Sequence, residues 1–155
     1  MGLDMYLNAK RYLSDYRDAD APAKDGILQQ FPELNAYLEE ESEANPITGV
    51  IAKVGYWRKA NQIHNWFVQN VQEGQDDCMP YYVGRQQLLE LKSICERVLA
   101  DNSLAGELLP TQAGFFFGGT EYDEMYFSDL KETVRLIDKA LTLPDAWDFQ
   151  YQSSW

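Results

Sequence analysis

The sequence predicts an α+β fold in a single domain spanning 1–155, with a small antiparallel or mixed sheet packed with three to four helices. A chain of 155 residues suffices for one well-formed core, whereas two independent domains would each approach marginal burial. Hydrophobic residues make up 45% and charged residues 25%, which argues against disorder and collagen-like repeats. Strand-like and helix-like segments succeed one another without a strict β-α-β alternation, and this order favours α+β over α/β.

Two strands and one helix are expected in the first part of the chain. Apolar residues alternate with polar ones over 3–7, which predicts a short half-buried strand. Residues 12–46 are mostly polar, and within them apolar residues at helical spacing predict a helix from about 27 to 43. The β-branched residues of 47–54 predict a second strand, which ends where Gly55 lets the chain turn.

Three further helices are predicted by apolar stripes at helical spacing, and they span about 56–72, 85–100 and 123–142. Gly74 and Pro80 mark a break between the first two of these helices. The three phenylalanines of 115–117, flanked by glycines, predict a short, fully buried strand. Alternating aromatic residues over 147–151 predict a closing strand.

The net charge of −12 opposes binding to nucleic acid or to an anionic membrane surface and favours a basic partner. No basic segment precedes an apolar run, and no apolar run approaches the roughly 20 residues of a membrane span, so we expect a cytoplasmic protein. The charge is uneven, because residues 47–72 contain no acid but three bases, Lys53, Arg58 and Lys59. This cationic segment also contains the single histidine and two of the four tryptophans.

Trp66 lies among polar residues when the helix expected over 56–72 is projected at 100° per residue. An indole on a polar face must be covered by another part of the fold or offered to a partner. Arg58 and Lys59, near the expected start of the helix, suit a phosphate or carboxylate, or they pair with acids of the same chain.

His64 lies at the edge of the apolar face of that helix. It is either a general base or ligand oriented by Asn61, or a partly buried neutral imidazole with hydrogen-bonded nitrogens, which we favour. Cys78 and Cys95 are too few and too isolated for a disulfide framework or a zinc site. We expect reduced thiols, with Cys95 in the core, and predict no metal and no cofactor.

Four carboxylates gather near the start of the last helix, at Glu121, Asp123, Glu124 and Asp129. Capping of the helix explains most of them. In a functional interpretation, Glu121 with Asp123 or Glu124 would bind a divalent metal or act as acid and base, across a cleft from His64.

Four blocks of the sequence, in order along the chain, resemble a family of small uncharacterised proteins encoded by bacteriophages and prophages. The blocks read MGLDMYL, VGYWRKANQIHNWFVQN at 54–70, LLPTQAGFFFGGTEYDEMYF at 108–127, and YQSSW. Residues 8–46 fall outside them, so 12–46 is interpreted as a variable acidic segment within the domain. The resemblance implies a phage product in the bacterial host cytoplasm that is not a virion component.

Two functions are compatible with these features. The first is an acidic interaction protein that inhibits a host or anti-phage defence protein by occupying its basic, nucleic-acid-binding surface. Its expected partner-binding residues are Trp66, Arg58, Lys59, Glu39, Glu40, Glu41 and Glu124. The alternative is a small enzyme or ligand-binding module with a pocket between the 56–72 helix and the 114–130 acidic turn, using His64, Arg58, Glu121 and Asp123. We favour the first, so enzymatic activity is the less expected outcome.

Overall fold

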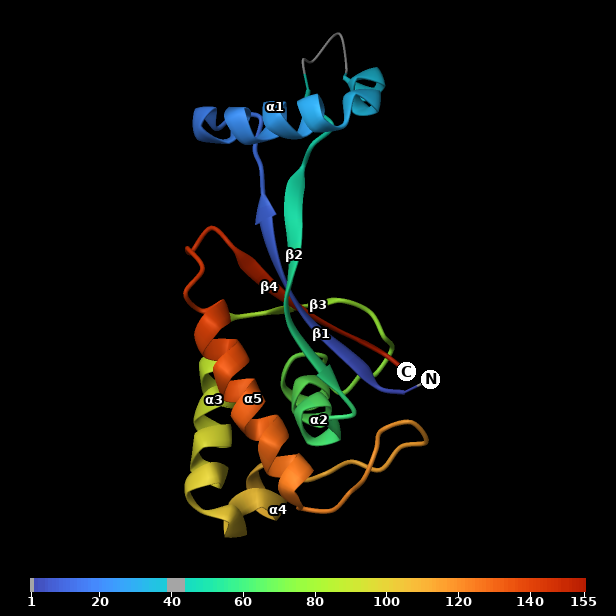
Figure 1. Ribbon diagram of the computed structural model, residues 1–155, viewed down its shortest axis with the longest axis vertical. Coiled ribbons are helices and arrows are strands. Elements are labelled where there is room, and N and C mark those ends of the chain that lie inside the picture. Colours follow the sequence, from blue (N-terminus) through green and yellow to red (C-terminus); the bar gives the residue numbers. More distant parts are fainter. Residues whose placement is uncertain (1, 39–43) are drawn as a thin grey trace. The chain divides into compact units, whose positions relative to one another are not determined.

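The computed structural model describes residues 2–38 and 44–155 and has an α+β fold (Figure 1). Its sheet is antiparallel, with four strands in the order β2-β1-β4-β3, so the predicted fold class is confirmed. Internal contacts divide the chain into two compact units, which are described separately. The larger unit comprises Met1–Ala9 and Ala52–Trp155, and the smaller unit comprises Lys10–Ile51. That all of 1–155 acts as a single domain stays a prediction.

The sheet is built from two long strands and two short ones. Their bounds are β1 (Asp4–Tyr12), β2 (Gly49–Arg58), β3 (Tyr81–Val83) and β4 (Asp148–Ser154). In β1, Met5 and Leu7 are buried and their neighbours are partly exposed, as the alternation of apolar residues predicts. β4 pairs with β3 in antiparallel register, with Tyr151 opposite Tyr81.

The helices of the larger unit are α2 (Asn61–Asn70), α3 (Arg85–Ala100), the 3₁₀ turn η3 (Asn102–Leu104), α4 (Ala105–Leu108) and α5 (Glu124–Ala140). α3 and α5 lie side by side (Figure 1). The core is aromatic at its centre, where Phe67 of α2 stacks on Tyr151 of β4 with ring centroids 3.9 Å apart. Cys95 is buried there as predicted, and burial raises the pKa of its thiol to about 12.

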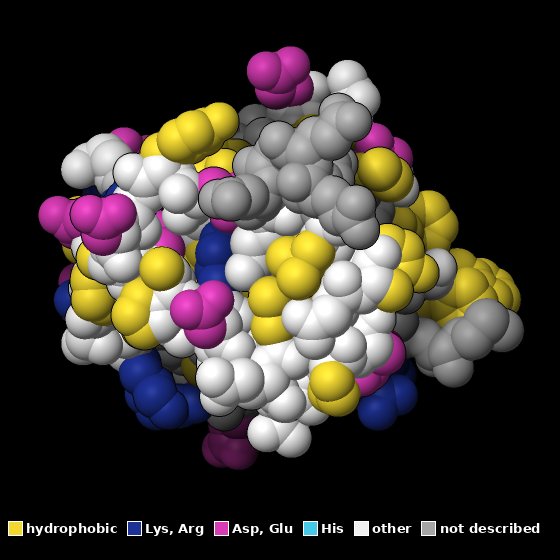
Figure 2. All heavy atoms as spheres, turned by 90° about the horizontal axis from the view of Figure 1, so that it is seen from above, with side chains coloured by type: hydrophobic (Ala, Val, Ile, Leu, Met, Phe, Trp, Pro, Cys, Tyr) yellow, Lys and Arg dark blue, Asp and Glu magenta, His cyan; other side chains and the backbone are white. Residues whose placement is uncertain are grey.

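The smaller unit contains η1 (Asp18–Asp20), α1 (Ala21–Gln30) and η2 (Pro32–Tyr37), together with the adjoining ends of β1 and β2. Its buried apolar residues are few: Leu13, Leu28 and Ile47. Two charged side chains are also buried, Asp20 and Lys24. On the face seen in Figure 2, hydrophobic and acidic side chains lie next to one another.

The predicted helix over 27–43 is wrong in its bounds. Pro22 lies in the first turn of a helix that begins at Ala21, where its fixed φ and missing N–H are tolerated. That helix ends at Gln30, because Pro32 disfavours helical backbone in the residue before it, and Phe31 has φ −125° and ψ 71°. A 3₁₀ turn follows, and residues 39–43 lie outside the described residues.

Three other predictions need correction. The 56–72 helix begins only at Asn61, because β2 continues through Gly55 to Arg58 and Lys59 adopts a left-handed φ of 59°. The phenylalanines of 115–117 form a turn and not a buried strand, and Phe115 is 95% exposed. β3 lies within the segment predicted as a break.

Over the described part of the chain, no helix combines the length and the apolar character that crossing a membrane requires.

Candidate functional site

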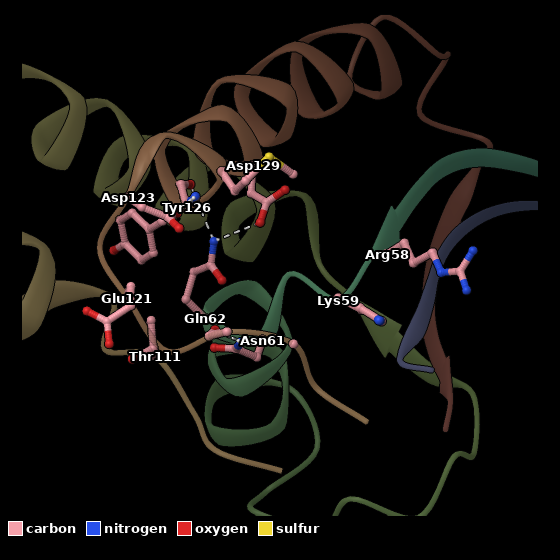
Figure 3. Close-up of a pocket in the computed structure, with 12 residues that line it drawn as sticks. Arg58, Lys59, Asn61, Gln62, Thr111, Glu121, Asp123, Tyr126 and Asp129 are labelled. Atoms are coloured by element: carbon pink, nitrogen blue, oxygen red, sulfur yellow. Dashed lines mark hydrogen bonds between the residues drawn. The ribbon is translucent and has the colours of Figure 1, made fainter. Parts of the chain in front are cut away.

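A cavity of about 220 Å³ lies in the larger unit where β2 passes into α2, facing the loop before α5 and the first turns of α5 (Figure 3). Its position is the one predicted for a pocket between the cationic segment and the acidic turn. It is lined by Arg58, Lys59, Asn61, Gln62, Thr111, Gly118, Gly119, Glu121, Asp123, Met125, Tyr126 and Asp129.

Asn61 fixes the loop that forms one wall of the cavity. The side chain is buried, and its Nδ2 donates to the carbonyl oxygens of Phe117, at 3.0 Å, and Gly119, at 2.8 Å. Its Oδ1 accepts a hydrogen bond of 2.8 Å from the backbone N–H of Gln112. Asn61 therefore orients this loop. The less favoured interpretation of the sequence, in which Asn61 orients His64, is wrong.

Gln62 and Asp129 form the polar floor of the cavity. Gln62 Nε2 donates to Asp129 Oδ2 at 3.2 Å and to the carbonyl oxygen of Tyr126 at 3.4 Å. Burial raises the pKa of the Asp129 carboxyl to about 6, the hydrogen bond from Gln62 opposes this rise, and the nearby charge of Asp123 adds to it. Asp129 is thus a carboxyl group that lacks a cationic partner among the described residues.

Arg58 and Lys59 lie at the other side of the cavity and are exposed (Figure 3). The sequence places them near the start of a helix, but in the structure they belong to the end of β2 and to the link between β2 and α2. Within residues 2–38 and 44–155, neither forms an ion pair with a carboxylate. The alternative that they pair with acids of the same chain is thus not realised among the described residues, and both alternatives from the sequence stay predictions.

The predicted acidic residues separate into different roles. Asp123 caps α5, accepting a hydrogen bond of 3.1 Å from the backbone N–H of Tyr126, and it also lines the cavity with Glu121. Glu124 is exposed in the first turn of α5 and does not line this cavity. In the described parts of the chain, no group of three or more His, Cys, Asp or Glu side chains is arranged to hold a metal ion.

His64 lies outside the cavity and is only 1% exposed. Its Nε2 is 2.9 Å from Asp76 Oδ2, and its Nδ1 is 2.7 Å from the hydroxyl of Tyr151. The indole N–H of Trp155 donates to the other oxygen of Asp76 at 3.1 Å. These contacts agree with the favoured interpretation of a buried imidazole with both nitrogens hydrogen-bonded, and they place His64 apart from Glu121 and Asp123.

Trp66 is covered by the fold and is not offered to a partner. It is 6% exposed and packs edge-to-face on Phe67, with ring centroids 5.3 Å apart. The helix that carries it is buried on nearly all sides, including the side with Gln62, so its polar residues do not mark a solvent-exposed face. The prediction of Trp66 as a partner-binding residue is therefore wrong.

Gln62 is the main cavity residue that the sequence interpretation missed, and Asp129 was not assigned to the pocket. Asp129 follows Tyr126 by three residues on α5 and so lies beside the buried stripe of that helix. That spacing was a usable signal for a carboxylate at the edge of the core. Gln62 carried no such signal, because it belongs to the side of α2 that the sequence predicts to be polar.

Comparison of the chain with protein-family models, with curated proteins and with solved structures gave no match. The role of each region is therefore argued from its own geometry.

Proposed function

We propose that this protein is an acidic interaction protein that binds a basic protein surface through its smaller unit, Lys10–Ile51. The observation that carries the proposal is the exposure of large hydrophobic side chains in that unit. Seven of the fifteen such side chains exposed among the described residues belong to it, although it is about a quarter of the chain. They are Tyr12, Tyr16, Phe31, Tyr37, Leu38, Val50 and Ile51.

Tyr16 shows the feature most clearly, since it is 99% exposed and its ring contributes nothing to the core. Exposed tyrosines that offer area at low cost in conformational entropy are typical of protein-binding surfaces. Among the described residues of the same unit, three buried apolar residues form the core. The unit therefore presents more aromatic surface than it buries.

The charge that the smaller unit presents to solvent is acidic because three of its four basic residues are paired internally, and only Lys10 is exposed without an ion pair to a described residue. Arg11 and Arg17 lie 3.1 and 3.5 Å from the carboxylate of Asp20, and Lys24 lies 2.6 Å from that of Asp15. The remaining acids within the described part of the unit form no ion pair and are exposed: Asp18, Asp25 and Glu33. Such a surface complements a basic partner.

The resemblance to phage and prophage proteins supports a setting for this partner. In a bacterial host, a basic surface that binds nucleic acid is found on host and defence proteins, and an acidic protein that occupies it would block access of nucleic acid. We propose inhibition of such a protein as the biological role. Glu39, Glu40 and Glu41, which lie outside the described residues, extend the acidic segment in sequence.

The test is affinity capture from bacterial host lysate at low salt, followed by mass spectrometry. The wild-type chain should retain a nucleic-acid-binding protein, and added duplex DNA should release this protein from the chain. Replacing Asp18, Asp25 and Glu33 by Lys should abolish retention, and so should a second variant with Glu39, Glu40 and Glu41 changed to Lys. A control with Glu73, Glu90 and Glu107 changed to Lys carries the same charge change on the larger unit and should retain the partner. Equal retention by all variants would refute the proposal.

A further inference from the structure

The cavity of the larger unit contains hydrogen-bond acceptors that no residue of the described chain uses. Gln62 is 3% exposed, and only its Nε2 is hydrogen-bonded, while its Oε1 accepts no hydrogen bond from the described residues. The buried side-chain atoms without a partner in the described chain are elsewhere, at Arg11, Gln72 and Ser153. The Oε1 of Gln62 is therefore accessible, and it faces the cavity that Gln62 lines.

Asp129 adds a second free acceptor beside this one. Its Oδ2 accepts from Gln62 Nε2, but its Oδ1 has no hydrogen-bond donor among the described residues. A partly buried carboxylate without a cation nearby is unfavourable, and its raised pKa reports this cost. A ligand with several N–H donors and a positive charge would satisfy both oxygens and remove the cost.

The mouth of the cavity has the opposite character. Figure 3 shows Glu121 and Asp123 on one side of Gln62, and Lys59 and Arg58 on the other side, with the charged ends of Lys59 and Arg58 directed away from Gln62. A ligand that is only anionic would meet three carboxylates, whereas the two exposed cations can turn toward an anionic group that is held at the mouth. A molecule that carries both charges fits this distribution.

Hydrogen bonds fix the backbone of residue 59 at the mouth of the cavity. Lys59 has a left-handed φ of 59°, its N–H donates to the carbonyl oxygen of Leu3 at 2.8 Å, and its own carbonyl oxygen accepts from Asn61 N–H at 2.9 Å. Gly118 lies against Lys59, where an added Cβ would come within 3.1 Å of Lys59 Cβ. The stem of Lys59 thus passes between Gly118 and Gly2, and its ammonium group forms no ion pair with any residue that the structure describes.

We propose that this cavity binds a small zwitterion of amino-acid size, with its ammonium group on Asp129 and Gln62 Oε1 and its anionic group toward Lys59 and Arg58. The inference concerns the larger unit alone and does not depend on the proposed binding of a basic protein by the smaller unit.

The experiment is ligand-observed NMR with three matched series of compounds. The zwitterions are the ω-amino acids from glycine to 6-aminohexanoate, and the controls are the n-alkylamines and the n-alkyl carboxylates of the same chain lengths. We expect saturable binding of at least one zwitterion, with affinity at least tenfold above that of the amine and carboxylate of equal length. The absence of saturable binding across the zwitterion series would overturn the proposal.

Variants then locate the site. Asp129→Asn should weaken binding of the zwitterion at least tenfold, and the double change Arg58→Gln with Lys59→Asn should weaken it severalfold while leaving alkylamine binding unchanged or stronger. The two mouth residues are exposed, and Asn tolerates the backbone of residue 59, so this double variant should fold as the wild type does. Glu90→Gln, on the exposed face of α3, is the matched control. Wild-type affinity in both site variants would refute the assignment.

Discussion

The two units of the molecule are stabilised by different interactions. In the larger unit, apolar and aromatic side chains are buried in one continuous core, centred on the stacked rings of Phe67 and Tyr151. In the smaller unit, three apolar residues form the core, and Asp20 and Lys24 are buried with charged partners. The larger unit therefore depends mainly on the hydrophobic effect, and the smaller unit depends on charge pairing as well.

This difference also separates the possible functions of the two units. The larger unit buries aromatic side chains in its core, whereas the smaller unit exposes Tyr12, Tyr16, Phe31 and Tyr37. The composition, with seven Phe, ten Tyr and four Trp, allows an aromatic core or an aromatic contact surface, and the larger unit contains such a core.

The largest effect is expected from Phe67→Ala. The ring is fully buried and contacts Trp57, Trp66 and Tyr151, so its removal leaves a cavity and should lower the free energy of unfolding by about 3–5 kcal/mol. Urea unfolding followed by tryptophan fluorescence measures this loss. Phe31→Ala, at a half-exposed ring of the smaller unit, should change the same quantity by less than about 1 kcal/mol. Similar losses for both variants would contradict the contrast between the units.

A local effect is expected from Asp20→Asn. This carboxylate accepts hydrogen bonds from Arg11 Nη2 at 3.1 Å and from the backbone N–H of Ser14 at 3.0 Å, and Arg17 lies nearby. Without its charge, the arginines lose their partner, and we expect faster amide hydrogen exchange in Lys10–Ile51 with unchanged exchange in α3 and α5.

Asp25→Asn provides the matched control for this prediction, because it removes the same charge from an exposed position on α1. It should leave the exchange rates of the smaller unit as in the wild type. Equal acceleration by the two variants would mean that net charge, and not the buried pairing, determines the stability of the unit.

The smallest effect is a dependence on pH that has opposite sign in the two units. The pKa of Asp129 is raised to about 6 by burial, so its protonated form is favoured in the folded state. In the unfolded chain the pKa of Asp129 is about 4. As the pH falls from above 6 toward 4, the free energy of unfolding of the larger unit should therefore rise by about 1 kcal/mol, a figure that is reduced for solvent screening. Thermal unfolding at pH 7 and pH 5 measures the gain, and Asp129→Asn should abolish it.

In the smaller unit, the pKa values of Asp15 and Asp20 are lowered. For Asp15 the main cause is the hydrogen bond from Lys24, and for Asp20 it is the backbone hydrogen bond from Ser14, followed by the charges of Arg17 and Arg11. Their contribution is complete above the unfolded pKa near 4 and is lost as pH falls through the lower folded values. The protection of the amides in Lys10–Ile51, taken relative to the intrinsic exchange rate at each pH, should therefore fall below about pH 4. A loss of protection already between pH 7 and pH 5 would contradict this assignment.

Elements with a long periodic pattern were predictable from the sequence. The strand over 3–7, the helices over 85–100 and 123–142 and the closing strand all correspond to elements of the structure, since each buries one regular face. β3 has only three residues, too few to establish a period, and its pairing partner β4 is distant in sequence.

The candidate site was predictable in place but not in composition. The segments that form the cavity were identified from charge, and Arg58, Glu121 and Asp123 do line it. His64 and Trp66 were misplaced relative to it because a projection of α2 assumes one solvent-exposed side. Gln62, on the expected polar side, is buried against Tyr126 and Asp129 of α5, and such a contact between distant segments leaves no local pattern in the sequence.

The position of β4 has a consequence for the kinetics of folding. β4 follows every other element of the larger unit in the chain, yet it lies between β1 and β3 in the sheet. Neither neighbour can complete its pairing until residues 148–154 have left the ribosome, and the pairing of β1 with β4 must close a loop of well over a hundred residues. Such non-local contacts slow folding, so the aromatic core of the nascent chain stays incomplete until residues 148–154 have been synthesised.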